Sequence, residues 1–447
     1  PPTKVVVNLA PADLKKDGSG LDLPIAIGIL SATRQIEAQE ATEAVYVGEL
    51  ALDGSLRGIN GVLPMILGAQ EKGRRHIYIP WDNAAEGQVV DDIKVYAPKT
   101  LAEVANHFIN GEAITVCRKV SGQENIRKNY AVDFSEVEGQ LIAKRALEIA
   151  AAGGHNVLMV GAPGAGKTML ARRLPTILPN MSEAEKLEVS KIYSVAGLLN
   201  KRQGLITERP FRTPHHTVSQ NALVGGGRLP RPGEVTLSHN GVLFLDEFPE
   251  FSRSALEVLR QPMEDGFVTI SRVQASLTFP AGFILVAAQN PCPCGYYGES
   301  DGVHECCCSM GDLERYRKKI SGPLLDRIDL QVHVPRLNYR DLKLKTNGET
   351  SALIRQRVIA ARNIQLERLK QEKLNCNSAM GHREIIKYCH LTTAAEQLLE
   401  KYYATLGLSA RSHDRIIKVA QTIADLSKAA CIDTVHLAEA IQLRTKE

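Results

Sequence analysis

Three apolar stretches in the middle of the chain set the pattern that predicts the fold. Residues 156–160, 241–246 and 282–289 are mainly apolar, and each ends at or just before a glycine, an acid or an amide. Short runs of this kind are typical of strands in a parallel sheet with helices on both faces. Residues 140–152 keep apolar side chains on one face, and two glycines follow, which predicts a helix that ends there. The centre of the chain is therefore predicted to be an α/β domain.

The two ends of the chain have different patterns. The N-terminal part predicts strands at 4–8, 44–50 and 76–79 and helices at 23–33, 61–72 and 101–110. The C-terminal part predicts helices alone, at 352–373, 382–389, 393–404, 409–427 and 433–444. We therefore predict an α/β domain at 1–112, a linker at 113–133, a core at 134–335, a linker at 336–350 and a helical lid at 351–447. Because residue 1 is not methionine and a strand is predicted almost at once, we expect the chain to start partway into its first domain.

A glycine-rich loop follows the first apolar stretch and precedes a helical pattern at 169–174. It consists of Gly161, Ala162, Pro163, Gly164, Ala165, Gly166, Lys167 and Thr168, which fits the pattern G-x-x-x-x-G-K-[ST]. In such a loop, backbone N–H groups and the N-terminus of the next helix surround nucleotide phosphates. Lys167 would reach the β- and γ-phosphates, and Thr168 would ligate Mg²⁺. The loop predicts ATP and Mg²⁺ as ligands; a glycine-rich turn that matches by chance is the alternative.

Two acidic residues, Asp246 and Glu247, end the second apolar stretch. The carboxyl ends of parallel strands are where α/β sheets hold their ligands. Asp246 is predicted to hold Mg²⁺ with Thr168, and Glu247 to polarise the water that attacks the γ-phosphate. A solvated strand end with two surface acids is the alternative. Together with the glycine-rich loop, the acids predict ATP hydrolysis and not nucleotide binding alone.

Three further residues are candidates for the hydrolysis reaction. Asn290 ends the third apolar stretch, where its amide would contact the γ-phosphate and the attacking water; a turn-forming strand end is the alternative. Arg327 stands between two acids and is predicted to act as an arginine finger on the ATP of an adjacent subunit, or else to form an internal ion pair. Arg411, in the predicted lid, is a candidate contact to the γ-phosphate, with a surface salt bridge as the alternative.

Five of the nine cysteines lie between residues 292 and 308. Two C-x-C pairs among them could supply four thiolates to a tetrahedral structural Zn²⁺. The candidate ligands are Cys292, Cys294, Cys306 and Cys308. Cys307 and His304 are competing ligands, and free thiols in a loop are the alternative. Clustered cysteines fit a metal site in a reducing compartment better than a disulfide framework.

Composition narrows the class of protein only moderately. The 447 residues are 44% hydrophobic and 23% charged, which is ordinary for a globular protein, and the net charge of +4 does not require a nucleic-acid partner. No apolar run approaches the roughly 18 residues of a membrane span. The first residues also lack the charged and apolar regions of an export signal. We therefore expect a cytoplasmic protein without membrane contact.

Taken together, the motifs define a resemblance that covers nearly the whole chain. Its most specific parts are residues 211–216, 223–227, 232–234 and 321–328, and residues 7–13 and 21–25 add to it. With the glycine-rich loop and its acids, these residues resemble the magnesium-chelatase-like AAA+ ATPases of the YifB/ComM type. The resemblance implies an AAA+ core with a helical lid. It also implies a ring-forming homo-oligomer, hexameric, that drives branch migration of DNA during natural transformation.

The N-terminal domain also resembles the protease domain of Lon, through residues 16–18 and 48–54. Lon-type proteolysis needs a serine nucleophile that is activated by a lysine. The position expected for the serine holds Gly20, Ser19 is out of register, and no lysine occurs between residues 17 and 71. We therefore predict that this domain is not a peptidase and that it contacts DNA or shapes the ring.

For the DNA partner that the resemblance implies, we expect contacts from two loop regions. Residues 201–240 contain six Lys and Arg against two Glu, and residues 266–279 predict a hairpin. The candidate contacts are Arg228, Arg231, Arg272 and Gln274. Translocation without sequence preference needs contacts to phosphates and not to bases. Ordinary solvated loops are the alternative.

The sequence thus predicts an ATP-driven DNA motor with an AAA+ core. Two rival functions stay open. A chelatase-type enzyme would use the same core to insert Mg²⁺ into a porphyrin as part of a larger complex. A remodelling or regulatory ATPase would act on proteins, with the N-terminal domain as its binding module.

Overall fold

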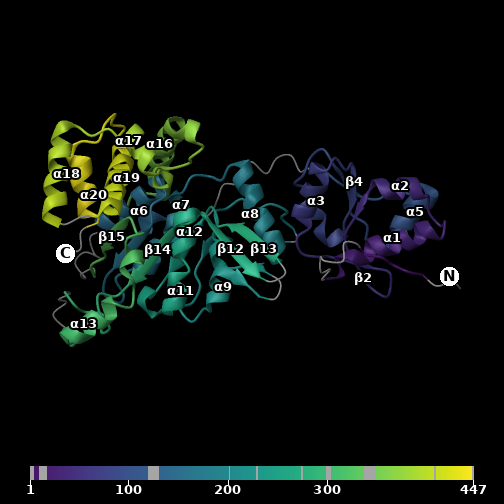
Figure 1. Cartoon of the computed structure of the whole chain (residues 1–447), viewed down its shortest axis with the longest axis horizontal. Helices are drawn as coiled ribbons and strands as arrows, with labels where there is room; N and C mark the ends of the chain where they lie inside the picture. Colours follow the sequence, from purple (N-terminus) through teal and green to yellow (C-terminus); the bar gives the residue numbers. More distant parts are fainter. Residues whose placement is uncertain are drawn as a thin grey trace. The chain divides into compact units, whose positions relative to one another are not determined.

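The chain forms two compact units, which are described separately below (Figure 1). The first comprises Pro1–Lys128 with Ser182–Glu208, and the second comprises Asn129–Met181 with Arg209–Glu447. The structure, a computed structural model, describes residues 5–9, 18–118, 130–200, 202–227, 230–272, 275–298, 304–336, 348–406 and 409–444. Within these ranges, no helix combines the length and the apolar character needed to cross a membrane.

The first unit is built on a small sheet in the order β1-β4-β5-β6. Its strands are β1 (Val45–Tyr46), β4 (His76–Tyr78), β5 (Lys94–Tyr96) and β6 (Val116–Cys117); the first three are parallel, and β6 is antiparallel to β5. The helices include α1 (Asp22–Ala32), α2 (Ala38–Glu43), α3 (Val62–Glu71), α4 (Ala84–Gly87) and α5 (Leu101–Asn110), and β2 (Glu49–Leu50) pairs with β3 (Leu56–Arg57) as a hairpin.

The three helices predicted for this unit are present, but its strands are shorter than predicted. Residues 5–9 form no strand, and the single strand predicted at 44–50 is divided into β1 and β2. Stacked tyrosine rings cover one face of the sheet: Tyr46 and Tyr78 lie 5.0 Å apart, and Tyr78 and Tyr96 lie 4.7 Å apart. Offset stacking of this kind adds to the burial of apolar area, so short strands suffice.

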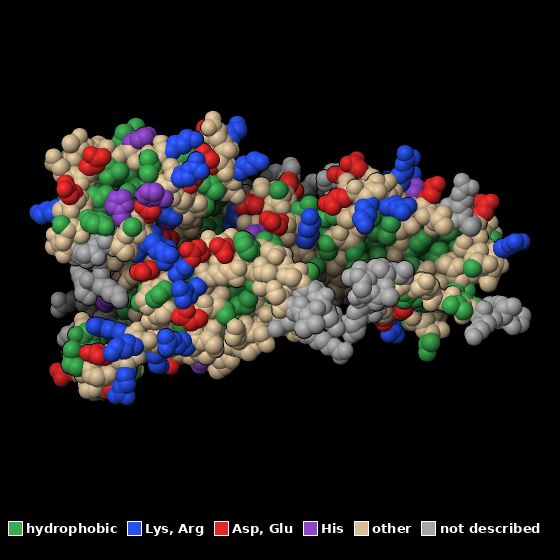
Figure 2. Space-filling model, in the orientation of Figure 1, with side chains coloured by type: hydrophobic (Ala, Val, Ile, Leu, Met, Phe, Trp, Pro, Cys, Tyr) green, Lys and Arg blue, Asp and Glu red, His purple; other side chains and the backbone are tan. Residues whose placement is uncertain are grey.

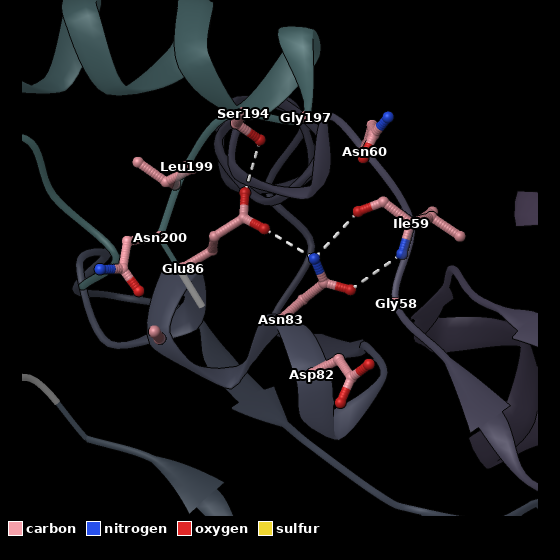
Figure 3. Close-up of a pocket in the computed structure, with 11 residues that line it drawn as sticks. Gly58, Ile59, Asn60, Asp82, Asn83, Glu86, Ser194, Gly197, Leu199 and Asn200 are labelled. Carbon is pink, nitrogen blue, oxygen red and sulfur yellow. Dashed lines mark hydrogen bonds between the residues drawn. The ribbon is translucent and has the colours of Figure 1, made fainter. Parts of the chain in front are cut away.

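One helix of the first unit comes from the middle of the chain. Helix α8 (Glu183–Ala196) follows the glycine-rich loop and its helix in sequence, and our predicted core of 134–335 did not set it apart. The buried carboxylate of Glu86 accepts hydrogen bonds from Ser194 Oγ at 2.5 Å and Asn83 Nδ2 at 2.7 Å (Figure 3). It also accepts from the backbone N–H of Leu63 at 2.8 Å. A buried carboxylate that lost these donors would be costly, so Glu86 holds α8 in this unit. Asn83, Glu86 and Ser194 also line a cavity of about 100 Å³.

The second unit is built on a parallel sheet in the order β15-β7-β14-β11-β8 (Figure 1). Its strands are β7 (Val157–Val160), β8 (Phe211–Arg212), β11 (Val242–Leu245), β14 (Ile284–Gln289) and β15 (Leu330–His333). The three apolar stretches of the sequence form β7, β11 and β14, which are direct neighbours: Val286 pairs with Val157 on one side and with Phe244 on the other. Because all these strands are parallel, their carboxyl ends meet at the same edge of the sheet.

Two helices connect this sheet to the C-terminal helices. Helix α6 (Leu141–Gly153) is buried along almost its whole length, and α7 (Lys167–Ile177) follows the glycine-rich loop. The lid contains α16 (Ser351–Leu369), α17 (His382–Tyr388), α18 (Thr393–Leu406), α19 (Ala410–Leu426) and α20 (Thr434–Gln442), close to the predicted helices. One apolar cluster contains residues of the sheet, of α6 and of the lid. Two ion pairs, Arg145–Glu439 and Arg357–Glu148, also connect α6 with lid helices.

The second unit also contains short helices and two antiparallel ribbons. The helices are α9 (Gln220–Val224), α10 (Glu234–Leu237), α11 (Arg253–Glu257), α12 (Arg260–Asp265), α13 (Met310–Arg317) and α14 (Gly322–Leu325). The predicted hairpin is present as β12 (Phe267–Arg272) and β13 (Ala275–Pro280), and a smaller ribbon pairs β9 (Gly225–Gly226) with β10 (Arg231–Pro232).

Candidate active site

The glycine-rich loop connects the carboxyl end of β7 to the N-terminus of α7, as predicted. Gly161 donates its backbone N–H to Gln289 O at 3.2 Å, and a Cβ at this position would lie 2.1 Å from the carbonyl oxygen of Val334. The loop is therefore squeezed between β14 and the end of β15, where only glycine fits. Gly166, with φ of 89°, starts α7, whose first N–H groups face the loop. Such a helix start binds anions such as phosphate.

Lys167 is buried and is held by oxygen atoms of the same edge. Its Nζ donates to Gly161 O at 2.5 Å, to Ala162 O at 3.0 Å and to Asn290 Oδ1 at 3.1 Å. The structure thus brings together Lys167 and Asn290, which the sequence assigns to the same phosphate. These oxygen atoms offset the cost of burying the ammonium group.

The predicted Mg²⁺ ligands also meet at this edge. Thr168 Oγ1 donates to Asp246 Oδ2 at 2.7 Å, although the two residues are 78 positions apart in the chain. A hydroxyl and a carboxylate oxygen are suitable ligands for Mg²⁺, which binds through one or two carboxylates and keeps its other positions for water and phosphate. The residues present therefore fit the metal that an ATP site needs.

Glu247 has an unusual backbone and a partner that the sequence did not predict. Its φ of 51° and ψ of 45° are left-handed, and its N–H donates to Asp246 Oδ1 at 3.0 Å. Left-handed non-glycine residues are uncommon and often occur at functional sites. The side chain of Glu247 is 57% exposed, and its Oε2 lies 3.0 Å from His216 Nδ1. No signal in the sequence predicted this pair, because nothing in the pattern links His216 to an acid 31 positions later.

Arg327 lies at the other edge of the sheet. Its carbonyl oxygen accepts from Asn156 Nδ2 at 3.2 Å, and Asn156 directly precedes β7. The glycine-rich loop follows the opposite end of β7, so the four residues of that strand, roughly 13 Å, separate Arg327 from the loop of its own chain. The guanidinium is buried, forms an ion pair with Glu264 and donates to Pro323 O at 2.8 Å. Arg327 therefore has the internal ion pair that the sequence left as an alternative, at a distance from its own nucleotide loop.

Arg411 lies close to the same place. It is exposed at the start of α19, and its charge, with that of Arg415, acts on Glu264. The hydrogen bond from Arg327 is the main cause of the lowered pKa of Glu264, and these charges add to it. Arg411 thus groups with Arg327 and not with Lys167.

A buried acid anchors the lid beside these arginines. Asp329 accepts from the backbone N–H of Asn156 at 3.1 Å, and its carboxylate lies 3.3 Å from Arg415 Nη1 and 3.5 Å from His155 Nδ1. His155 Nε2 also lies 2.8 Å from Thr422 Oγ1 on α19. Burial alone would raise the pKa of Asp329, but the His155 ring and the charges of Arg415 and Lys418 hold that pKa well below its usual range.

The predicted cysteine ligands form a tight cluster directly after β14. The Sγ atoms of Cys292, Cys294, Cys306 and Cys308 all lie within 4.8 Å of one another. The Sγ–Sγ distances are 3.2 Å for Cys292–Cys294, 3.8 Å for Cys292–Cys306 and 3.6 Å for Cys294–Cys306. Four sulfurs around a tetrahedral Zn²⁺, with Zn–S bonds of about 2.3 Å, are about 3.8 Å apart. The cluster therefore has the size and the donor set of a tetrathiolate metal site.

Local hydrogen bonds surround the first pair of cysteines and favour the thiolate form of Cys294. The backbone N–H groups of Gly295 and Tyr297 donate to Cys292 Sγ at 3.2 Å and 3.3 Å. For Cys294, burial would raise the pKa, but hydrogen bonds from the Tyr296 backbone and from Cys292 lower it to about 6. A hydrogen bond from the Cys294 backbone lowers the pKa of Cys308, but burial and the neighbouring thiols Cys294 and Cys292 outweigh it and raise that pKa to about 12. A cation would be needed to ionise all four thiols together.

The candidate DNA contacts are only partly described by the structure. Arg231 is exposed on β10, whereas Arg228 and Gln274 lie outside the described residues, and the side chain of Arg272 is also outside them. Arg212, one of the basic residues of this region, forms a bidentate ion pair with Glu234: Nε donates to Oε2 at 2.6 Å and Nη2 to Oε1 at 2.8 Å. The DNA contacts therefore stay predictions.

Lys and Arg side chains also gather over α13 (Figure 2). Basic side chains of this patch are already paired with acids: Arg315 with Asp312, Lys318 with Glu314, and Lys319 with Glu250. The patch therefore has the charge pairing of an ordinary solvated surface. Exposed pairs of this kind contribute little to stability.

The order of the parallel sheet, the glycine-rich loop after β7, the acids after β11 and the helical lid together define an AAA+ ATPase core of the magnesium-chelatase type. Comparison with known families agrees. The family described as "Magnesium chelatase, subunit ChlI" matches residues 133–342, its C-terminal counterpart matches 348–444, and "Subunit ChlI of Mg-chelatase" matches 1–83.

Individual relatives make the assignment narrower. Competence protein ComM of Haemophilus influenzae is 46% identical over 449 residues, covering 99% of this chain and 86% of the relative. YifB of Escherichia coli is 43% identical over 446 residues, covering 99% and 85%. The chain belongs to the YifB/ComM family of magnesium-chelatase-like AAA+ ATPases. Lon protease 2 of Bacillus subtilis is 31% identical over 100 residues, 22% of this chain and 18% of that protein, which agrees with a Lon-like part.

Proposed function

We propose that the chain hydrolyses ATP at sites shared between neighbouring copies in a ring, hexameric in the simplest form, and uses this energy to move along DNA. One observation carries the proposal. Lys167, Thr168, Asp246, Glu247 and Asn290 converge on one edge of the sheet, whereas Arg327 and Arg411 group at the other. A complete ATP site therefore needs residues from two chains.

The loop edge supplies the binding and water-activating groups. Lys167 exchanges its carbonyl contacts for the β- and γ-phosphate oxygens, while the loop amides and the start of α7 hold the remaining oxygens. Thr168 and Asp246 hold Mg²⁺, which neutralises developing charge on the phosphates. Glu247 takes the proton of the attacking water, and Asn290 orients that water against the γ-phosphate. Lys167 already contacts Asn290, and Thr168 contacts Asp246. The backbone of Glu247 contacts Asp246, whereas its side chain contacts His216.

The arginine edge supplies charge to the neighbour's nucleotide. Arg327 and Glu264 line a cavity of about 550 Å³, together with Arg260 and other residues of α12 and β12. A phosphate that approaches this cavity competes with Glu264 for the guanidinium of Arg327 and gains a buried, charge-assisted hydrogen bond. Arg411 approaches the same nucleotide from the lid. Arg415 of the lid forms an ion pair with Asp329, which directly precedes β15 and comes two residues after Arg327. Hydrolysis at one site therefore changes the position of the lid in the next chain.

DNA is the proposed track because of the relationship to ComM and because the β9–β10 ribbon carries the exposed Arg231. Arg228, Arg272 and Gln274 stay candidate contacts from the sequence. Branch migration is the activity that we propose, with the N-terminal domain contacting DNA or shaping the ring and without peptidase activity. We keep the predicted domain boundaries, with α8 assigned to the N-terminal part.

The cysteine cluster is proposed to hold a structural Zn²⁺ through Cys292, Cys294, Cys306 and Cys308. Its spacing and donor set support this ion over Mg²⁺, which prefers oxygen ligands. Thiols that must stay free for a metal fit the reducing cytoplasm, where we place the protein.

The test is the ATPase rate and branch migration on a synthetic four-way DNA junction, with Lys167→Ala as the inactive control. We expect the junction to stimulate hydrolysis in a salt-sensitive way and the wild type alone to move the branch point. ATPase activity that ignores DNA but responds to a porphyrin partner complex would favour the chelatase function. A response to a folded protein substrate alone would favour the remodelling function.

A further inference from the structure

The cysteine cluster and the ATP-binding loop are in direct contact. Cys292 comes two residues after Asn290, whose Oδ1 accepts from Lys167 Nζ at 3.1 Å. Gly295 lies against Pro163 of the glycine-rich loop: a Cβ at position 295 would be 2.7 Å from Pro163 Cδ, and the φ of Gly295 is +93°. Two separate contacts therefore join the cysteine loop to the nucleotide loop.

We infer that the tetrathiolate site is a metal-dependent brace for the ATP site, in which a zinc ion fixes residues 290–297 so that Asn290 and Pro163 are positioned for the nucleotide. The inference rests on the proposed function and adds a regulatory ligand to it. Zinc and ATP would bind to different residues but stabilise the same arrangement of one segment.

The local structure explains why this segment needs a brace. Residues 290–297 follow the end of β14, and Cys292 and Gly295 are buried within this segment. The turn is held by Gly295 N, which contacts both Cys292 O at 3.0 Å and Cys292 Sγ at 3.2 Å. The second pair of cysteines, Cys306 and Cys308, comes from the other side of the loop, just before α13. One ion bound by all four thiols would therefore link the start of the loop to the residues just before α13. Part of the free energy of metal binding would be used to order the loop.

Thermodynamic linkage makes the inference quantitative. If zinc tightens ATP binding by some factor, ATP must tighten zinc binding by the same factor. Couplings between two sites in one protein are typically about 5- to 150-fold, and the two direct contacts place this one at about tenfold.

The first experiment measures both halves of this linkage on the full chain. Zinc content is determined by mass spectrometry of the metal, and the affinity for a non-hydrolysable ATP analogue is measured with and without zinc. Zinc affinity is then measured with and without the analogue by competition with a chromogenic chelator. We expect one zinc per chain and matching shifts of about tenfold in both directions. Zinc binding that leaves the analogue affinity unchanged would overturn the inference.

Variants separate the metal from the shape of the loop. Cys306→Ser is expected to lose zinc and to weaken analogue binding, whereas Cys307→Ser, an exposed neighbour in the same loop, is expected to change neither. Gly295→Ala keeps all four thiols but forces a methyl group against Pro163, so zinc is retained and the analogue binds more weakly. Normal analogue affinity in both Cys306→Ser and Gly295→Ala would contradict the brace.

Cobalt(II) gives a readout that is independent of activity and of folding defects in variants. A Co²⁺ tetrathiolate has visible ligand-field bands, which we expect to shift when the analogue binds to wild type but not to Lys167→Ala. Unchanged bands in wild type, with the analogue bound, would contradict the coupling. A protein that binds zinc but never binds ATP would instead refute the proposed function, so the two failures are distinguishable.

Discussion

The two edges of the parallel sheet differ in how their charged groups are satisfied. At the carboxyl edge, Lys167 is held by carbonyl and amide oxygens, and Glu247 is largely exposed. At the opposite edge, Arg327 and Asp329 are buried and already have ionic partners in the same chain. The first edge is arranged to receive an anion, whereas the second is arranged as a closed network of ion pairs.

The difference supports the proposal that one chain contains two halves of different ATP sites. The carboxyl edge has the phosphate-binding groups, with Lys167 among them. The opposite edge has cations beside a cavity. Substitutions at the two edges should therefore fail in different ways, and mixtures of the two should complement each other.

The largest expected effect is that of Arg327→Ala. Loss of an arginine finger lowers the turnover number by about 10³- to 10⁵-fold, with ATP affinity nearly unchanged, because the charge acts in the transition state. Glu264→Gln is the matched control: it breaks the same ion pair but leaves the guanidinium, and we expect substantial turnover. Steady-state ATPase assays and analogue binding check both. Normal turnover in Arg327→Ala would contradict the arginine-finger role and would assign Arg327 to an internal ion pair alone.

Glu247→Gln, at the carboxyl edge, should cause the next largest loss of turnover. Removing a general base costs about 10²- to 10⁴-fold in turnover, whereas the amide keeps the shape and does not impair ATP binding. The expected result is a protein that retains unhydrolysed ATP, measured by nucleotide extraction after gel filtration. Release of ADP at the wild-type rate would remove Glu247 from the reaction.

Asp329→Asn tests the buried network as a structural anchor. Leaving Arg415 without its acid should lower the free energy of unfolding by about 3 kcal/mol, measured by urea denaturation near neutral pH. Because the folded-state pKa of Asp329 lies below the unfolded value of about 3.9, its stabilising contribution is complete above that pH. The contribution is lost as the pH falls from there towards the folded-state pKa, so wild type and variant should converge in acid. A constant difference at all pH values would assign the effect to something other than this carboxylate.

His216→Ala should have the smallest effect. The pair between His216 and Glu247 is partly exposed, so its loss should change turnover by less than about fivefold. If His216 holds Glu247 away from the water, the basal ATPase rate rises and DNA stimulation shrinks. A loss as large as that of Glu247→Gln would show that His216 itself takes part in the reaction.

Much of the catalytic edge could be predicted because its signals are local in sequence. Continuous apolar runs identified β7, β11 and β14, and the residues that follow them were the predicted site residues. Parallel pairing then brings those residues together without further information. The four cysteines were found for a similar reason, since their spacing is itself the signal.

Other features depend on long-range contacts that have no periodic signal. Glu264 pairs with Arg327 across 63 positions, and His216 reaches Glu247 from a loop with ordinary composition. Helix α8 joins the N-terminal unit through Glu86, an acid that would be taken for a surface residue in the sequence. The predicted strand at 4–8 was wrong for residues 5–8, the part of it that the structure describes, because an apolar pattern alone does not supply a partner strand.

The most direct test mixes two inactive proteins, Glu247→Gln and Arg327→Ala, under conditions that allow subunits to exchange. Each carries an intact copy of the half site that the other lacks, so an interface with Glu247 from one chain and Arg327 from the next is complete. The account predicts that ATPase activity reappears in the mixture and is greatest near equal amounts. Mixed rings that form but stay as inactive as either parent would contradict a site shared between chains.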